Sequence, residues 1–462
     1  MLSAFTNCFK IPELRKRILF TLGIIIIVRL GSAIPAPGVD GTVLNAFFNQ
    51  VVETGNKTNV LAIFNMFSGR ALQHCAIFSL GIMPYISASI IMQLMTAVVP
   101  RFGKLAREEG GRAKITQYTR YMTLGLCLFQ GFLLAQGFAY PESFPLLGGI
   151  DEVIKSEGKP LVPIINFQYY FSCVLTLTAG TMLMMWLGEK ITERGIGQGI
   201  SIIVMVGIIA GIPSGVTELW QMLTVAGPNQ LNPITLLLLL GFLFGVIMAV
   251  ISVTEATRKI PVSYPRRVVG RKVYGGQTNY MPLKVNYAGV MPIIFAQAIL
   301  LFPQTILTFS FFEKVPGISK LLMMLQPHTL TYGLLYSGMI FFFSYFWVAT
   351  MFNPIQIADD LKKYGGYIPG VRPGKPTSDF LNYTMTRITL AGATFLTIIA
   401  ILPEFVNNQI KIPYSVGQFF GGTSLLIAVG VMLDTMRQIE THLLQRHYDG
   451  FLKKGRIRGR VG

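Results

Sequence analysis

The sequence predicts an all-α polytopic membrane protein with about ten apolar helices that cross a lipid bilayer. The 462 residues are 52% hydrophobic and only 13% charged, which is about half the charged fraction of an ordinary soluble domain. Stretches with almost no charge recur along the chain, and most of them exceed the roughly 18 apolar residues that indicate a transmembrane helix. In chain order these stretches are 18–28 with its continuation, 60–100, 121–141, 161–188, 219–254, 285–312, 321–358, 388–403 and 412–433.

The first apolar run follows the basic residues Arg15, Lys16 and Arg17 and precedes the stretch GSAIPA. This order imitates a secretory signal with its cleavage site. We favour an uncleaved first span, because the run continues past Arg29 to the helix-ending IPAPG if the long Arg29 side chain extends toward the membrane surface.

Basic residues gather in alternate connections between the predicted spans. Of the 39 Lys and Arg residues, 31 fall at the N-terminus, within 101–120, 190–194, 258–284 and 362–387, and within 437–460. The positive-inside rule therefore places these connections and both termini in the cytoplasm. An even number of spans follows, consistent with ten.

Few residues of the chain are arranged for chemistry. The cysteines lack metal-like spacing and lie mostly in apolar runs, so we interpret them as small core residues. The histidines show neither a metal-binding nor a nucleophile–base pattern, and no glycine loop is suited to a phosphate. We therefore expect no enzyme, no metal site and no cofactor. The residues considered are Cys8, Cys75, Cys127, Cys173, His74, His328, His442 and His447.

The interiors of the predicted spans contain almost no ionisable residues. Proton- and ion-coupled transporters usually keep such residues at mid-membrane. The pattern therefore favours a conduit over a coupled carrier, although helix ends and carbonyls can also bind ions.

Two long cytoplasmic connections look structured. In 255–284, short β-branched and aromatic runs flank GRKVYGG, which predicts a protruding β-hairpin with a basic tip. In 353–387, glycines and prolines predict an exposed turn that presents Arg372. Such basic loops suit a docked macromolecule, through RNA phosphates or an acidic protein surface. The alternative is charge that sets topology and contacts anionic lipid.

Six long segments carry a resemblance to a known family. They are MFSGRALQHCAIFSLGIMPYISASIIMQL, GRAKITQYTRY, GTMLMMWLGEKITERGIGQGISIIV, PLKVNYAGVMPIIFA, FNPIQIADDLKKYGGYIPGVRPG and GGTSLLIAVGVMLD. On these segments the chain resembles the SecY/Sec61-alpha family of protein-conducting channels over essentially its whole length. The resemblance implies ten transmembrane helices in two pseudo-symmetric five-helix halves around a central pore, with a short plug helix. The expected parts are 1–220 (spans 1–5, plug at about 60–70), 221–440 (spans 6–10, cytoplasmic loops at about 255–284 and 353–387) and 441–462 (basic cytoplasmic tail).

The resemblance also implies a ring of apolar side chains at the waist of the pore. The ring comprises Ile82, Ile86, Ile200, Val204, Met291 and Ile427. The first pair and the second pair are each four residues apart, so each pair shares one helix face. A narrow apolar ring excludes water and ions when empty and offers a passing chain no polar group to bind. Met291 makes the seal slightly more pliable.

Three further sets of residues follow from the resemblance. The plug set is Ile63, Phe64, Met66, Phe67 and Gly69, in a stretch too short to cross a membrane, with the Ser–Gly pair as a flexible link. An ordinary re-entrant packing element is the alternative. The second, third, seventh and eighth spans would form a lateral gate with Ser87 and Gln130, although hydrogen bonding between helices elsewhere explains these residues equally well. The partner-binding set is Arg266, Arg267, Arg271, Lys272, Arg372 and Lys375.

The function implied is a channel subunit that translocates unfolded secretory proteins across the bacterial plasma membrane and releases transmembrane segments into lipid. The implied partners are the subunits SecE and SecG, the motor ATPase SecA, the ribosome, signal peptides, unfolded precursors and membrane lipids. A secondary carrier for a small hydrophobic or lipid substrate is the main alternative. A membrane scaffold explains neither the ring spacing nor the basic loops.

Overall fold

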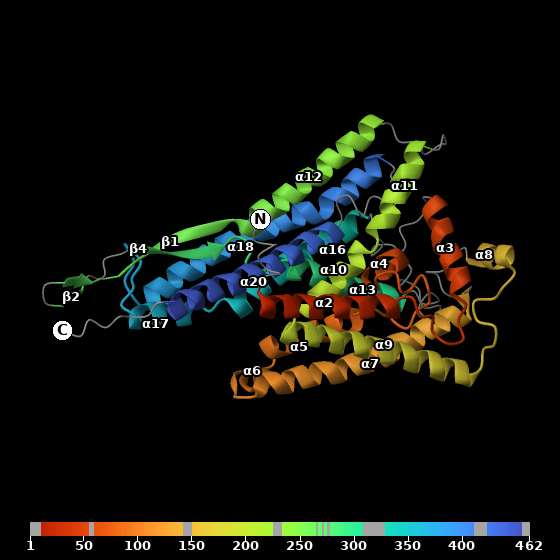
Figure 1. The fold of residues 1–462 in the computed structure, drawn as a ribbon, viewed down its shortest axis with the longest axis horizontal. Helices are drawn as coiled ribbons and strands as arrows, with labels where there is room; N and C mark the ends of the chain where they lie inside the picture. The colour runs from red at the N-terminus through yellow and green to blue at the C-terminus, as the bar shows by residue number, and fades with distance from the viewer. Residues whose placement is uncertain are drawn as a thin grey trace. The chain divides into compact units, whose positions relative to one another are not determined.

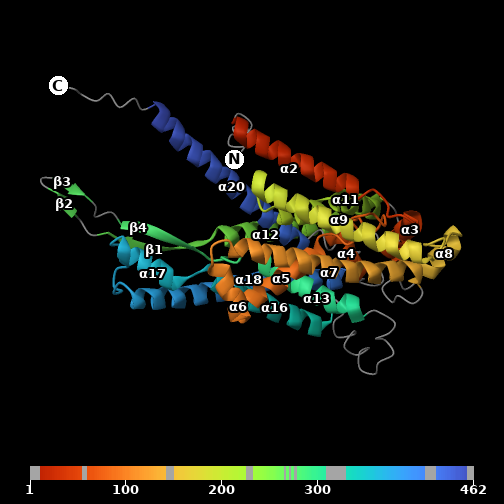
Figure 2. The ribbon, with the colours of Figure 1, turned by 90° about the horizontal axis from the view of Figure 1, so that it is seen from below.

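The computed structural model describes residues 11–54, 60–141, 150–224, 233–264, 267–269, 272–274, 278–307, 329–410 and 423–454. Helices make up most of this structure, as Figures 1 and 2 show. They are α2 (Pro12–Gly31), α3 (Gly41–Thr54), α4 (Val60–Phe67), α5 (Met83–Val98), α6 (Pro100–Arg107), α7 (Gly111–Ala139), α8 (Ile150–Glu157), α9 (Phe167–Arg194), α10 (Gly199–Ile209), α11 (Ile212–Thr224), α12 (Pro233–Glu255), α13 (Met291–Leu307), α16 (Leu330–Met351), α17 (Pro354–Lys363), α18 (Lys375–Ile410) and α20 (Thr423–Lys454).

Within the described ranges, six helical stretches are long and apolar enough to cross a membrane. A seventh is added if α5 and α6, which meet at a bend of 102°, count as one span. The other three predicted spans coincide with α2, α13 and α20. Each of these has a shorter apolar stretch: α2 begins with charged residues, α13 is a short apolar helix, and α20 carries charged residues from Asp434 onward. The predicted all-α, multi-span class is therefore confirmed.

The chain divides into two compact units. Unit 1 comprises Met1–Met92, Leu105–Thr217 and Val431–Gly462, and unit 2 comprises Gln93–Lys104 and Glu218–Gly430. The pseudo-symmetric halves at 1–220 and 221–440 remain a prediction.

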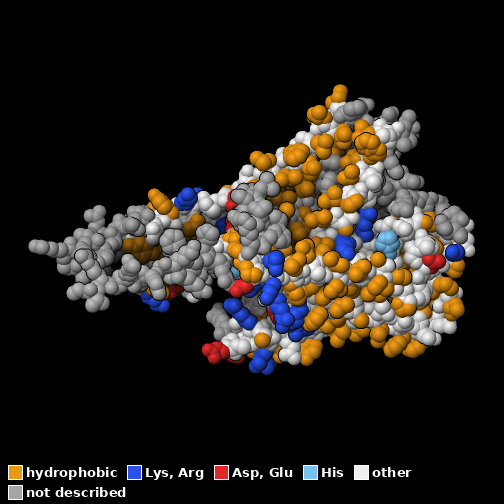
Figure 3. Space-filling view, viewed as in Figure 1, with side chains coloured by type: hydrophobic (Ala, Val, Ile, Leu, Met, Phe, Trp, Pro, Cys, Tyr) orange, Lys and Arg blue, Asp and Glu red, His pale blue; other side chains and the backbone are white. Residues whose placement is uncertain are grey.

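In unit 1, α7 and α9 pack side by side and α10 packs against α9. Small residues allow this closeness, as they commonly do where transmembrane helices meet. A Cβ atom added to Gly199 of α10 would lie 1.9 Å from the carbonyl oxygen of Gly188 in α9. The outer faces of α7 and α9 expose large apolar side chains such as Phe129 and Trp186, and hydrophobic atoms cover this flank in Figure 3. These faces suit contact with lipid.

In unit 2, α13, α16 and α18 form the packed centre. The ring of Phe295 on α13 lies edge-on to Phe343 and Trp347 of α16, at centroid distances of 5.9 and 5.5 Å. Such edge-to-face pairs add stability beyond the burial of their area. Helix α12 is peripheral, because only 17% of its apolar window is buried.

The hairpin predicted for 255–284 is confirmed. Strand β1 (Thr257–Ser263) pairs antiparallel with β4 (Thr278–Lys284), from Thr257 opposite Lys284 to Ser263 opposite Thr278. Beyond it, β2 (Arg267–Val269) pairs with β3 (Lys272–Tyr274). The sequence KVY therefore forms a strand, whereas we predicted that it belongs to the tip.

The expected outward course of Arg29 is wrong. Its half-buried guanidinium donates hydrogen bonds to the carbonyl oxygens of Gly69, at 2.9 Å, and of Val206. Two backbone carbonyls within reach of this long side chain give its charged donors direct hydrogen-bond acceptors, so it does not extend to the membrane surface.

Candidate functional site

The irregular segment 68–82 connects α4 to α5, and most of its residues are buried in unit 1. Backbone outside helices is tolerated at membrane depth only where the protein itself satisfies its polar groups. Here the amide of Ala36 donates to the Cys75 carbonyl at 2.7 Å, and the amide of Ile77 donates to the Ile34 carbonyl at 2.9 Å. Arg70 and Cys75 have positive φ, of 68° and 47°. Such strained backbone is concentrated at functional sites.

Phe78 anchors this segment between two helices. A Cβ on Gly31 of α2 would lie 2.1 Å from the Phe78 ring, and one on Gly180 of α9 would lie 3.1 Å from it. Both glycines therefore act as notches that accept the ring. The anchored segment ends at Ile82, which sets the start of α5.

Ile82 and Ile86 stand one helical turn apart at that start. The Ile82 carbonyl accepts the first helical hydrogen bond, from the Ile86 amide at 3.1 Å. Both side chains are at most 5% exposed. They lie on one face of the helix start, as the spacing predicts.

On α10, Val204 is buried, whereas Ile200 is half-buried and packs beside Gly188 of α9. In unit 2, Met291 is the first residue of α13 and is half-buried, and Ile427 of α20 is fully buried. The elements that carry these two residues touch: a Cβ on Gly430 of α20 would lie 2.9 Å from the side chain of Val290, the residue before Met291. Unit 1 carries four of the six residues and unit 2 carries two, so the ring remains a prediction.

The predicted plug corresponds to α4, which has 8 residues. Phe64 and Met66 are half-buried and Phe67 is buried, while the side chain of Ile63 lies outside the described residues. Gly69 has φ of +67° and closes the helix: its amide donates to Met66, and the Arg70 amide donates to Asn65. This is a Schellman end, which requires a left-handed residue. The Ser–Gly pair is thus a defined turn rather than the flexible link we expected.

The predicted gate residues are both half-buried in unit 1, Ser87 on α5 and Gln130 on α7. The Oε1 atom of Gln130 is buried and has no hydrogen-bond partner among the described residues. A buried acceptor that lacks a donor destabilises the folded protein. The Gln130 side chain could therefore accept a hydrogen bond from a polar group outside the described residues.

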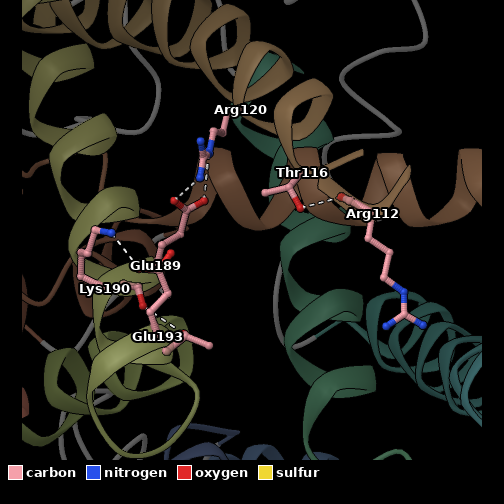
Figure 4. A network of polar contacts seen from close by, with 8 residues as sticks. Arg112, Thr116, Arg120, Glu189, Lys190 and Glu193 are labelled. Atoms are coloured by element: carbon pink, nitrogen blue, oxygen red, sulfur yellow. Dashed lines mark hydrogen bonds and ion pairs between the residues drawn. The ribbon is translucent and has the colours of Figure 1, made fainter. Parts of the chain in front are cut away.

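The sequence did not reveal an ion pair between the neighbours α7 and α9. Arg120 donates from Nε to Glu189 Oε1 at 3.1 Å and from Nη2 to Oε2 at 2.6 Å. Lys190 and Glu193 form a second pair at 2.7 Å (Figure 4). A bidentate Arg–carboxylate pair fixes the relative orientation of the two side chains as well as their distance. Residue type alone suggested only charge that sets topology.

The two basic loops of unit 2 form one body. Ser263 and Tyr367 exchange backbone hydrogen bonds at 2.9 and 3.0 Å. Beneath them, residues from both loops share a hydrophobic cluster. Its buried members are Ile260, Leu283, Ala288, Val348, Phe352, Ile368, Leu381, Met385 and Ile388.

The predicted turn presents its basic residues. Gly370 and Gly374 have φ of +84° and +101°, and Arg372 and Lys375 are exposed. Arg267 and Lys272 lie on strands, but their side chains are outside the described residues, as are Arg266 and Arg271 altogether.

Comparison with known proteins gives consistent matches. A family model described as SecY matches residues 76–436. The chain is 44% identical to the protein translocase subunit SecY of Escherichia coli strain K12, with 97% of this chain and 96% of that one covered. It is 42% identical to the same subunit of Thermotoga maritima, with both chains covered completely.

Solved structures match in fold. A protein-conducting channel aligns with a TM-score of 0.63 and 17% identity, covering 94% of this chain and 96% of that one. Sec61 in a canine ribosome–channel complex aligns with a TM-score of 0.60 and 16% identity over the same shares.

Proposed function

The chain belongs to the SecY family, and from this premise we propose that it carries unfolded secretory proteins across the bacterial plasma membrane and releases transmembrane segments sideways into lipid. As a member of this family it is a multi-pass membrane protein and a channel subunit of the Sec protein translocase, not an enzyme. The alternative of a small-molecule carrier is set aside on the same ground.

The observation that carries the proposal is the pair of large apolar side chains, one turn apart, at the start of α5 and again on α10. Ile82, Ile86 and Val204 are buried, and Ile200 is half-buried. With Met291 and Ile427 they would form the ring that seals the path, because a narrow apolar constriction excludes water. The short helix α4 would be the plug outside it.

The joined basic loops would bind the partners that drive transport. Arg372 and Lys375 project from a turn shaped by glycines, and the hairpin adds Arg267 and Lys272. We assign SecA and the ribosome to this surface, because clustered cations suit acidic protein and RNA phosphates. A related Sec61 channel is described in a ribosome complex. SecE and SecG would complete the channel, with signal peptides, precursors and lipids as the passing or surrounding partners.

Both termini would lie in the cytoplasm, on the side that carries most basic residues. The halves 1–220 and 221–440 would enclose the path, with α5, α7, α13 and α16 at the lateral gate, together with Ser87 and Gln130. The tail from 441 would be basic and cytoplasmic.

Crosslinking to a stalled precursor tests the proposal. Ile86→Cys, Ile200→Cys and Ile427→Cys would each be combined with a single cysteine in a secretory precursor halted in transit. Ile91→Cys on α5 is the matched control, since Ile91 is 38% exposed on the same helix. We expect crosslinks at the three ring positions, only with a functional signal sequence, and none at the control. Translocation without any ring crosslink would show that these residues are ordinary core.

A further inference from the structure

Arg29 connects three helices of unit 1. It lies in the last turn of α2, and its guanidinium reaches the Gly69 carbonyl at the end of α4 and the Val206 carbonyl in the last turn of α10. Among the described residues, no ion pair includes Arg29. Its charge is therefore met by backbone oxygens, which carry partial negative charge at helix ends.

The acceptors explain why arginine suits this position. Gly69 is the left-handed residue of the Schellman end of α4, so the carbonyl held by Arg29 belongs to the turn that terminates the plug. The Val206 carbonyl also accepts from the Ala210 amide at 3.1 Å. A planar guanidinium presents its donors in a fork and can serve two carbonyls at once, whereas an ammonium is a single point donor.

Close backbone contact supports the same joint. A Cβ on Gly69 would lie 3.1 Å from Gly207 Cα, and a Cβ on Gly207 would lie 3.5 Å from the Met66 carbonyl oxygen. A second bond runs nearby from Arg70 Nη2 to Ser214 Oγ. The end of α4 is thus fitted to α10, the helix that carries Ile200 and Val204.

We propose that Arg29 is a latch that holds α4 docked on α10 in the resting channel and that must release before α4 can leave. The proposal rests on the function given above and adds a positioning residue to it. Each hydrogen bond lost from a charged donor shifts an equilibrium about tenfold or more. Arg29→Leu should therefore raise the undocked population at least about tenfold, and Arg29→Lys should raise it less.

The test measures the resting leak of small anions. The channel complex, purified with its partner subunits, would be placed in vesicles of phosphatidylethanolamine and phosphatidylglycerol, and iodide entry would be followed with an entrapped dye. Arg17→Leu is the matched control, because Arg17 also lies on α2 and donates to a carbonyl, that of Gly195 at 3.4 Å, away from α4. We expect leak in the order Arg29→Leu, Arg29→Lys, then wild type and Arg17→Leu together.

A crosslink separates loss of the latch from loss of the fold. Met66→Cys with Gly207→Cys, added to Arg29→Leu and oxidised, should return the leak to the wild-type rate. Leak that equals the Arg17→Leu control, or that persists after complete crosslinking, would overturn the latch. A wild-type complex that fails to transport a precursor with its motor would instead overturn the proposed function.

Discussion

Gly180→Ala should disturb the segment that sets the start of α5. The added methyl group would lie 2.1 Å from the Ile77 carbonyl oxygen and 3.1 Å from the Phe78 ring. The first contact is with backbone, so a rotamer change cannot relieve it. Overpacking of this kind costs about 1–3 kcal/mol, while alanine in place of helical glycine returns about 0.5–1 kcal/mol. The cost of overpacking exceeds the gain in helix propensity, so the free energy of unfolding should fall by about 1–2 kcal/mol.

Gly125→Ala on α7 is the matched control, because a Cβ there meets nothing within 4 Å. It carries only the helix-propensity gain, so it should be neutral or slightly stabilising. The pair thus compares the same chemical change with and without a neighbour.

The assay uses the buried thiols of the protein. Cys75, Cys127 and Cys173 are fully buried, so a thiol-reactive fluorophore reports unfolding on heating once Cys8 is replaced by Ser. At about 2–4 °C per kcal/mol, Gly180→Ala should lower the melting temperature by several degrees. If Gly180→Ala melts at or above the temperature of Gly125→Ala, the close packing of 68–82 against α9 is refuted.

Three other predictions test separate features. A double-mutant cycle with Arg120→Ala and Glu189→Ala should give a coupling of about 0.5–1 kcal/mol in thermal unfolding, because one side chain is half exposed; no coupling would contradict the pairing. Arg372→Glu should weaken binding to the motor or ribosome by more than tenfold in a sedimentation assay at low salt and less at high salt; unchanged binding would exclude Arg372. The Asp40 carboxylate accepts hydrogen bonds from Thr42, which lower its pKa in the folded protein. The stabilisation from Asp40 should therefore be complete above the pKa of the unfolded state and be lost as the pH falls through the pKa of the folded state. Thermal melting across this pH range should show the loss in the wild type and not in Asp40→Asn.

Much of the fold was predictable because a lipid bilayer requires long apolar segments in the chain. Long apolar runs gave the spans, alternating β-branched runs gave the hairpin, and glycines gave the turn around Arg372. The run 60–100 was harder, since hydrophobicity does not distinguish a buried irregular segment from a helix. The structure divides it into α4, the segment 68–82 and α5, and α6 begins at its last residue, Pro100.

Partners distant in sequence were not predictable. The sequence displays the donor Arg29 but not its acceptors, the carbonyls of Gly69 and Val206 near the ends of α4 and α10. In the same way, Arg120 and Glu189 are 69 residues apart, and only the packing of α7 on α9 brings them together. From composition alone, we placed Arg29 and Arg120 at the membrane boundary. The tertiary structure instead gives each a specific acceptor: backbone carbonyls for Arg29 and the Glu189 carboxylate for Arg120.

The joining of the two basic loops, 255–284 and 353–387, has a mechanical consequence. Strand β1 continues directly from α12, and the loop that ends at Lys375 continues into α18, a helix of 36 residues. Because Ser263 and Tyr367 are joined by two backbone hydrogen bonds, a force applied to the hairpin acts on both α12 and α18. A motor pressing on its tip would act on a stiff lever, and its force would enter the membrane through α12 and α18 together.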